Sequence, residues 1–272
     1  MMPEHCTHAV ELLPDRVIKR FRGRDRAGAE REWRALSLLA VHAPGLAAEP
    51  WECDLAAAEP VVVMSRLSGE PMRGRPLSDE RVGALAAALH RLHTAVPPEA
   101  LERVPPRPDL AGELVARIHR WTPRTRPGLG GPVAQAMDAG LAWLASAHLD
   151  LPGPPEDPQV FGAGDGNLAN FLHDGRTVRI VDFEDSGRSD RAFELAEITE
   201  HVASWAEHPL DVPSFLGHFT LTRAERPRLR EYRRLLALVW LFLLLCDARS
   251  GNRRNPLDAV ERQSRRLRDL LG

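Results

Sequence analysis

Three polar residues in the second half of the chain have the types and the order that phosphoryl transfer requires. Asp165 and Asn170 are separated by four residues, and Asp182 follows on an apolar strand predicted over Val178–Phe183. A carboxylate can orient an attacking hydroxyl and accept its proton, while an amide oxygen and a second carboxylate can hold Mg²⁺ against nucleotide phosphates. An Asp-Gly turn between Asn170 and Asp182 predicts a hairpin that brings these two side chains together. We therefore predict a catalytic loop at 160–185, with all three residues catalytic and with Asn170 and Asp182 as metal ligands.

The elements that must position these residues fall into two regions. The first sixty-odd residues are predicted to mix strands with one helix: strands near 9–13, 17–21 and 61–64, and a helix over 29–40 with Trp33, Leu36, Leu39 and Ala40 on its apolar face. Helices follow, over 78–94 with Ser78 as its cap, over 112–121 and over 133–147. This plan predicts an α+β fold of two lobes: a nucleotide-binding lobe at 1–66, a hinge near 65–69, and a helical lobe at 67–272 that holds the acceptor site.

The composition excludes several other classes of protein. The chain has 272 residues and a formal net charge of −2, so nothing points to nucleic acid or to an acidic membrane surface. Three scattered cysteines argue against a disulfide framework or a zinc site.

The most apolar run, Leu235–Cys246, is twelve residues long, where a membrane span needs about 20, so we predict a buried core helix. No signal peptide is visible, and the expected location is the cytoplasm. The sequence does not determine the oligomeric state.

The catalytic segment resembles the aminoglycoside phosphotransferase family and its choline- and fructosamine-kinase relatives, which have a two-lobed protein kinase-like fold. The family motif is His-Gly-Asp, an Asn five residues after the Asp, and a strand that ends in Ile-Asp-Phe or Ile-Asp-Trp. Here the matching residues are Gly164, Asp165, Asn170, Asp182 and Phe183. Further along, Ser189–Ala196 resembles the helix start that follows in the family. The resemblance implies that Asp190 braces the catalytic loop and that Glu194 replaces the family's second Asp.

The resemblance extends upstream of the catalytic segment. Lys19 is the only lysine among 36 Lys and Arg residues, and it lies on a strand similar to the family's lysine strand. The resemblance implies that Glu32, four residues before Leu36, rather than Glu30, pairs with Lys19 and holds it against the α- and β-phosphates. Residues 63–69 resemble the strand and hinge that hold adenine. The predicted cofactors are ATP, with GTP as an alternative donor, and Mg²⁺, and the predicted cofactor-binding residues are Lys19, Glu32, Met64, Ser65 and Leu67.

Two departures from the family pattern leave other interpretations open. Ala163 stands in the place of the family histidine, and none of the sixteen residues before Val17 is glycine, so a plain hairpin would have to cover the phosphates. These departures are compatible with a degenerate, non-catalytic nucleotide-binding pseudokinase. The glycines at 162, 164 and 166, with Asp182 downstream, also fit a methyltransferase or dinucleotide-binding loop. Against that reading, residues 191–272 show helical patterns only, whereas a doubly wound sheet needs more strands.

The residues after the predicted metal ligand bear on the acceptor. Antibiotic kinases of the family present acidic residues to polycationic substrates, and this chain has Glu184, Asp185, Glu194, Glu197 and Glu200 in this region. Alternatively, Glu197 and Glu200 face water and take no part in binding the acceptor. The predicted function is an ATP-dependent kinase for a hydroxyl of a small molecule, either an aminoglycoside-like antibiotic, in a resistance role, or another natural product. The same catalytic residues would also serve a kinase of Ser or Thr in a peptide.

Overall fold

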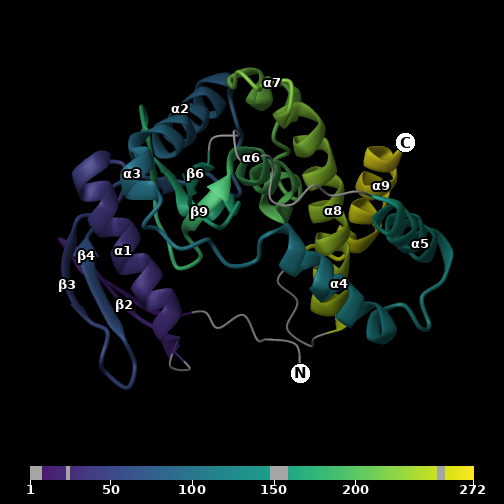
Figure 1. Cartoon of the computed structure of the whole chain (residues 1–272), viewed down its shortest axis with the longest axis horizontal. Coiled ribbons are helices and arrows are strands. Elements are labelled where there is room, and N and C mark those ends of the chain that lie inside the picture. The colour runs from purple at the N-terminus through teal and green to yellow at the C-terminus, as the bar shows by residue number, and fades with distance from the viewer. Residues whose placement is uncertain (1–7, 23–24, 148–158, 250–254) are drawn as a thin grey trace. The chain divides into compact units, whose positions relative to one another are not determined.

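The computed structural model describes residues 8–22, 25–147, 159–249 and 255–272 (Figure 1). The chain forms two compact units. Unit 1 comprises Met1–Pro108 and Gln159–Ser189, and unit 2 comprises Asp109–Pro158 and Asp190–Gly272. All the predicted catalytic and cofactor-binding residues therefore belong to unit 1. The lobe boundary predicted at residue 66 stays a prediction.

The first part of unit 1 is a four-stranded antiparallel sheet in the order β1-β2-β4-β3. Its strands are β1 (Ala9–Leu12), β2 (Arg16–Arg20), β3 (Pro50–Asp54) and β4 (Val61–Ser65). Lys19 lies on β2, an inner strand of this sheet, opposite Val10 on one side and Val62 on the other. The hairpin between β1 and β2 is closed by a bond from the Leu13 N–H to the Arg16 carbonyl, 2.9 Å long. Its turn contains no glycine, so β1 and β2 form the plain hairpin that the sequence predicts.

Helix α1 (Arg26–His42) packs against β3 and β4 (Figure 1). It begins after Asp25, whose carboxylate accepts a hydrogen bond from the Gly28 N–H at 2.9 Å. The face that it buries carries Gly28, Ala29, Glu32, Ala35, Leu36 and Leu39. The predicted apolar face was wrong at two positions: Trp33 is half-buried and Ala40 is exposed. With about 100° of rotation around the helix axis per residue, these two side chains lie outside the sector that the buried residues occupy, while the charged Glu32 lies inside it.

The rest of unit 1 contains short strands and helices around the predicted catalytic loop. A small antiparallel sheet joins β5 (Glu70–Pro71), β7 (Phe171–His173) and β8 (Val178–Ile180), and a second pairs β6 (Gln159–Gly162) with β9 (Gly187–Asp190). Helix α2 (Asp79–Ala95) starts at Ser78, whose hydroxyl accepts from the Arg81 N–H. The remaining elements are α3 (Pro98–Leu101) and the 3₁₀ turn η2 (Leu168–Asn170). The two larger sheets are antiparallel throughout, unlike the parallel sheet that a dinucleotide-binding fold requires.

Unit 2 is helical in the residues that the structure describes. Its elements are α4 (Ala111–Thr125), α5 (Gly131–Ser146), α6 (Arg191–Glu200), η3 (Val202–Ser204), α7 (Val212–Gly217), α8 (Glu225–Arg249) and α9 (Ala259–Leu271). Helix α8 contacts α4, α5, α6 and α9, and Leu235, Leu238 and Leu241 on it are fully buried. The predicted core helix is therefore the middle of α8. Within the described ranges, no helix combines the length and the hydrophobicity that a bilayer span demands.

Close packing of α5 against α8 and α9 predicts a substitution effect at Gly140. A Cβ atom there would lie 2.8 Å from a methyl carbon of Leu238 and 3.1 Å from one of Leu267. We expect Gly140→Leu to lower the free energy of unfolding by about 1–3 kcal/mol through overpacking. Gly112→Leu is the matched control, because a Cβ on α4 at that position meets nothing within 4 Å. Urea unfolding of both variants measures the difference, and equal stabilities would contradict this account of the packing.

Candidate active site

The predicted catalytic loop brings Asp165 and Asn170 into direct contact. The Asn170 side-chain amide donates to one Asp165 carboxylate oxygen at 2.9 Å, and the Asn167 N–H donates to the other, also at 2.9 Å. The turn η2 produces this geometry, because the Asn170 N–H bonds back to the Asn167 carbonyl. Since the Asn170 nitrogen is used on Asp165, its carbonyl oxygen is the atom left for other ligands. The loop thus presents a carboxylate and an amide oxygen side by side.

Gly164 places Asp165 through a backbone conformation that suits glycine. Its φ is +88°, in the left-handed region. A Cβ at this position would overlap the backbone carbonyl of Asp185. Two segments of the site, 162–165 and 182–185, therefore approach each other more closely at Gly164 than any side chain would permit.

A second cluster gathers around Lys19. Its ammonium lies 3.0 Å from Glu32 Oε2 and 2.7 Å from Glu184 Oε2, and it also donates to Asp182 Oδ1. Lys19 is 6% exposed and Glu32 is fully buried, so both charges depend on these contacts. Glu30, the alternative partner in the sequence analysis, lies on the other face of α1. Strand β2, helix α1 and the segment after β8 thus meet at one ammonium group.

Asp182 reaches this cluster because the strand before it ends early. The strand predicted over Val178–Phe183 ends at Ile180, although the Val181 N–H still bonds to the Asn170 carbonyl at 2.9 Å. Asp182 has φ +68°, a left-handed conformation that Asp tolerates better than most residues. The turn then directs the Phe183 N–H to Glu32 Oε2, at 2.8 Å. Glu32 therefore holds both the lysine and the backbone that carries Asp182.

Burial and crowding of like charges shift the ionisation of the site. Burial, together with the Asp182 and Asp185 carboxylates, raises the pKa of Asp165 to about 6, while the hydrogen bond from the Asn167 N–H and the charge of Arg107 oppose the rise. Burial likewise raises the pKa of Glu184 to about 7, against the effect of Lys19. For Lys19, burial alone would lower the pKa, but Glu32, Asp182 and Glu184 together raise it above its ordinary value. The ammonium is therefore charged, and Asp165 titrates near the range that suits a general base.

Sequence reasoning missed four residues that shape the site. It considered Glu184 only as an acceptor ligand, and it gave no role to His8, Arg31 or Arg107. His8 Nε2 lies 3.1 Å from Glu184 Oε2, Arg31 donates to the Glu184 carbonyl, and Arg107 donates to the Gly164 carbonyl at 2.8 Å. Only Glu184 carried a sequence signal, its position two residues after Asp182. The other three come from distant segments, and nothing in their local sequence marks them.

The three predicted adenine-binding residues lie at the end of β4 and in the segment after it. Met64 is buried, while Ser65 and Leu67 are half-buried. Ser65 exchanges two hydrogen bonds with Glu49, one through its N–H at 2.9 Å and one through its hydroxyl at 2.8 Å. The next residue, Arg66, donates from its N–H to Asp15 and from its guanidinium to Leu13, in the turn of the β1–β2 hairpin. This segment is thus fixed to the hairpin that begins the sheet.

The acidic residues of α6 have contacts of their own in unit 2. The alternative in which Glu200 faces water is wrong: it is fully buried, 2.6 Å from Arg233 and 2.9 Å from Arg266. It lies on the same helix face as buried Ala196, one turn earlier, and the arginines satisfy its charge. Asp190 begins α6 by accepting from the Ala192 N–H, and its carboxylate also accepts from Arg228 and from the Tyr232 hydroxyl.

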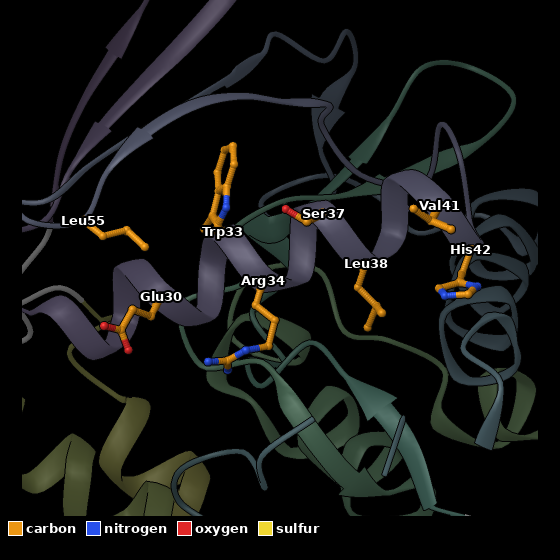
Figure 2. Close-up of a pocket in the computed structure, with 8 residues that line it drawn as sticks. All are labelled: Glu30, Trp33, Arg34, Ser37, Leu38, Val41, His42 and Leu55. Atoms are coloured by element: carbon orange, nitrogen blue, oxygen red, sulfur yellow. The ribbon is translucent and has the colours of Figure 1, made fainter. Parts of the chain in front are cut away.

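A groove of about 590 Å³ lies along α1. Figure 2 shows the side chains that line it. It is lined by Glu30, Trp33, Arg34, Ser37, Leu38, Val41, His42 and Leu55. Successive residues of an α-helix are rotated by about 100° around its axis. The Glu32 side chain therefore points about half a turn away from the centre of the α1 residues that line the groove. The groove is therefore separate from the cluster around Lys19, and it accounts for the half-exposed Trp33.

The oxygen atoms in the cluster suit a hard divalent cation. Carboxylate oxygens of Glu32, Asp182 and Glu184 all lie within 4.8 Å of one another. Magnesium prefers oxygen ligands and is bound through one or two carboxylates together with substrate phosphates. A cationic lysine beside these carboxylates is the complementary group for the phosphates themselves. The residues present thus fit a magnesium nucleotide.

Comparison with known proteins agrees with this chemistry. The model of the phosphotransferase enzyme family (APH) matches residues 8–232, most of the chain. A comparison of the sequence with curated proteins gives no significant match. Among solved structures, a choline/ethanolamine kinase family protein from Mesorhizobium loti is 19% identical with a TM-score of 0.66, over 97% of this chain and 85% of that one.

Two aminoglycoside phosphotransferase structures are similar to a comparable degree. The GDP and kanamycin complex of APH(2")-IIia is 15% identical with a TM-score of 0.67, over 99% of this chain and 91% of that one. The ADP and hygromycin B complex of APH(4)-Ia, in a thermostable mutant form, is 15% identical with a TM-score of 0.61, over 94% and 85%. These likenesses establish a two-lobed, protein kinase-like α+β fold, as the sequence predicted. The chain belongs to the phosphotransferase enzyme family, and the predicted family is confirmed.

Because Gly164 lies against the Asp185 backbone, the same substitution should have different effects at Gly164 and at Gly175. Gly164 and Gly175 both have positive φ, +88° and +100°, but a Cβ at Gly175 meets nothing within 4 Å. Gly175→Ala should therefore cost only the conformational strain, about 1–2 kcal/mol, and keep the activity. Gly164→Ala must also displace the 182–185 segment, and we expect the rate of phosphoryl transfer to fall about 10²-fold or more. Thermal unfolding and initial rates test this, and equal rates in the two variants would refute it.

Proposed function

We propose that this chain is an ATP-dependent kinase that phosphorylates a hydroxyl group of a small molecule. The observation that carries the proposal is the convergence in unit 1 of Asp165 bonded to Asn170 with Lys19 held among Glu32, Asp182 and Glu184. Membership of a phosphotransferase family supports the reaction type. The solved relatives named for choline or ethanolamine and for aminoglycosides support a small-molecule acceptor.

Each residue of the site has a separate role in this proposal. Asp165 orients the acceptor hydroxyl and accepts its proton, and its raised pKa makes it a stronger base than an exposed aspartate. Asn170 and Asp182 would hold Mg²⁺ with their side-chain oxygens, and the ion would supply the positive charge that neutralises the phosphates. Lys19 contacts the α- and β-phosphates, and Glu32 fixes its position. Catalysis is therefore mainly positioning and electrostatic stabilisation, as phosphoryl transfer requires.

The nucleotide base is proposed to lie at the end of β4, against Met64, Ser65 and Leu67. Among the described residues, the Leu67 N–H has no hydrogen-bond partner, so it can donate to the edge of a purine. ATP is the proposed donor and GTP the alternative, since the relatives were solved with ADP and with GDP. We propose that residues 1–66 form the nucleotide-binding lobe, and that 67–272 form the lobe that receives the acceptor.

The acceptor is proposed to be an aminoglycoside-like antibiotic or another hydroxylated natural product, encountered in the cytoplasm. The Asp185 carboxylate lies 3.8 Å from the Arg31 guanidinium and is 48% exposed, and its accessible part supports a cationic acceptor. Glu200 does not contribute, because its charge is neutralised by two arginines. An antibiotic acceptor would give the protein a resistance role.

Nucleotide binding tests the role of Lys19. We expect millimolar Mg²⁺–ATP to raise the melting temperature of the wild type, because a ligand that binds only the folded state stabilises it. Lys19→Met should bind at least about tenfold more weakly, which removes about 1.4 kcal/mol of that stabilisation. Arg20→Met is the control, since this neighbouring cation is exposed. A thermal shift in Lys19→Met as large as in the Arg20 variant would overturn the assignment.

Turnover tests the role of Asp165. A screen of hydroxylated metabolites and aminoglycosides for ATP consumption identifies the acceptor, and Asp165→Asn should then lower the rate about 10²–10⁴-fold at unchanged affinity for Mg²⁺–ATP. Asp79→Asn, at an exposed position on α2, is the control. Undiminished turnover in Asp165→Asn would mean that another residue is the base. If the wild type binds Mg²⁺–ATP and phosphorylates no acceptor, the chain is the non-catalytic pseudokinase.

A further inference from the structure

Arg107 is a buried cation that none of the predicted roles uses. It is 3% exposed, and its guanidinium donates to the backbone carbonyls of Gly164, at 2.8 Å, and Pro108, at 3.1 Å. An arginine carries its charge at any physiological pH, so burial requires that its fixed fork of donors finds acceptors. One of these acceptors belongs to the residue directly before the proposed base, Asp165.

The backbone around Arg107 is attached to the strand that follows the catalytic segment. The Arg107 N–H donates to the Arg188 carbonyl at 3.1 Å, and the Arg188 N–H donates to the Pro105 carbonyl at 3.0 Å. Gly187 permits this approach, because a Cβ there would lie 2.5 Å from the Arg107 nitrogen. Arg188 lies on β9, which pairs with β6, the strand that leads into the loop. The guanidinium is thus supplied by a segment fixed to the same small sheet as the loop it contacts.

The bond to Gly164 fixes more than one carbonyl group. The Gly164 carbonyl and the Asp165 N–H belong to one planar peptide unit, so the direction of the carbonyl sets the orientation of the Asp165 backbone. Gly164 can rotate easily because it is a glycine in the left-handed region, and Ala163 before it has no polar side-chain group. The Asp185 backbone limits movement on the Cβ side of Gly164, and Arg107 holds the carbonyl.

We propose that Arg107 is a positioning residue for the transfer reaction, which anchors the Gly164 carbonyl and thereby holds the Asp165 side chain in its productive orientation. This inference rests on the proposed function, in which Asp165 meets the acceptor hydroxyl. Arg107 itself does not touch the nucleotide or the acceptor. Its loss should therefore loosen the loop and slow the transfer, and it should leave the nucleotide site around Lys19 intact.

The test compares Arg107→Met with Arg103→Met, the same change at an exposed position four residues earlier. Hydrogen exchange by mass spectrometry on the full chain should show amides of residues 161–171 exchanging about tenfold faster in Arg107→Met, with β1, β2 and β4 unchanged. The affinity for Mg²⁺–ATP, measured by calorimetry, should stay within about threefold of the wild type. The rate of ATP consumption with the acceptor, or with water where no acceptor is known, should fall about 10²-fold.

Several outcomes would overturn the inference. Unchanged exchange at residues 161–171 would show that Arg107 does not hold the loop, and equally faster exchange throughout unit 1 would show a general structural role. Should Arg107→Met not fold, Arg107→Lys keeps the charge with fewer donors, and the same local rise in exchange is expected. If the wild type consumes no ATP, the proposed function fails by itself, while the exchange experiment still decides whether Arg107 anchors the loop.

Discussion

The site depends on one ammonium group that is almost completely removed from water. Lys19 contacts Glu32 from α1 and Asp182 and Glu184 from the segment after β8, and these elements are far apart in the sequence. A buried charge without partners would cost several kcal/mol, so the three elements are stable in this arrangement only together. Glu32 has the central place, because it also accepts the Phe183 N–H and so fixes the turn that carries Asp182.

Backbone conformation is the second constraint on the site. Gly164 and Asp182 both have positive φ, and each precedes a residue whose placement matters: Asp165 in one case and Phe183 in the other. A regular strand or helix at either point would direct these residues elsewhere. Left-handed residues persist where surrounding contacts hold them, and here the contacts are the Asp185 backbone and the Glu32 carboxylate.

The two departures from the family pattern, Ala163 and the first hairpin without glycine, lie in segments that distant parts of the chain hold in place. Ala163 stands in the place of the family histidine, and the guanidinium of Arg107 contacts the next residue, Gly164, from a different segment. The β1–β2 hairpin lacks glycine, and it is tied instead to the end of β4 through Arg66. In both places the contacts join segments that are distant in sequence.

The sequence by itself determined the order Asp165, Asn170, Asp182, the lone lysine and the helical plan of the second half, because motif spacing and periodicity are local properties. From these it predicted the family and the fold correctly. Only the tertiary structure decided that Glu184 joins the lysine cluster, that Glu200 is buried between two arginines, and that Arg107 contacts the catalytic loop. Such pairings depend on which segments meet in space, and a charged residue has the same local pattern whether it faces solvent or a buried partner.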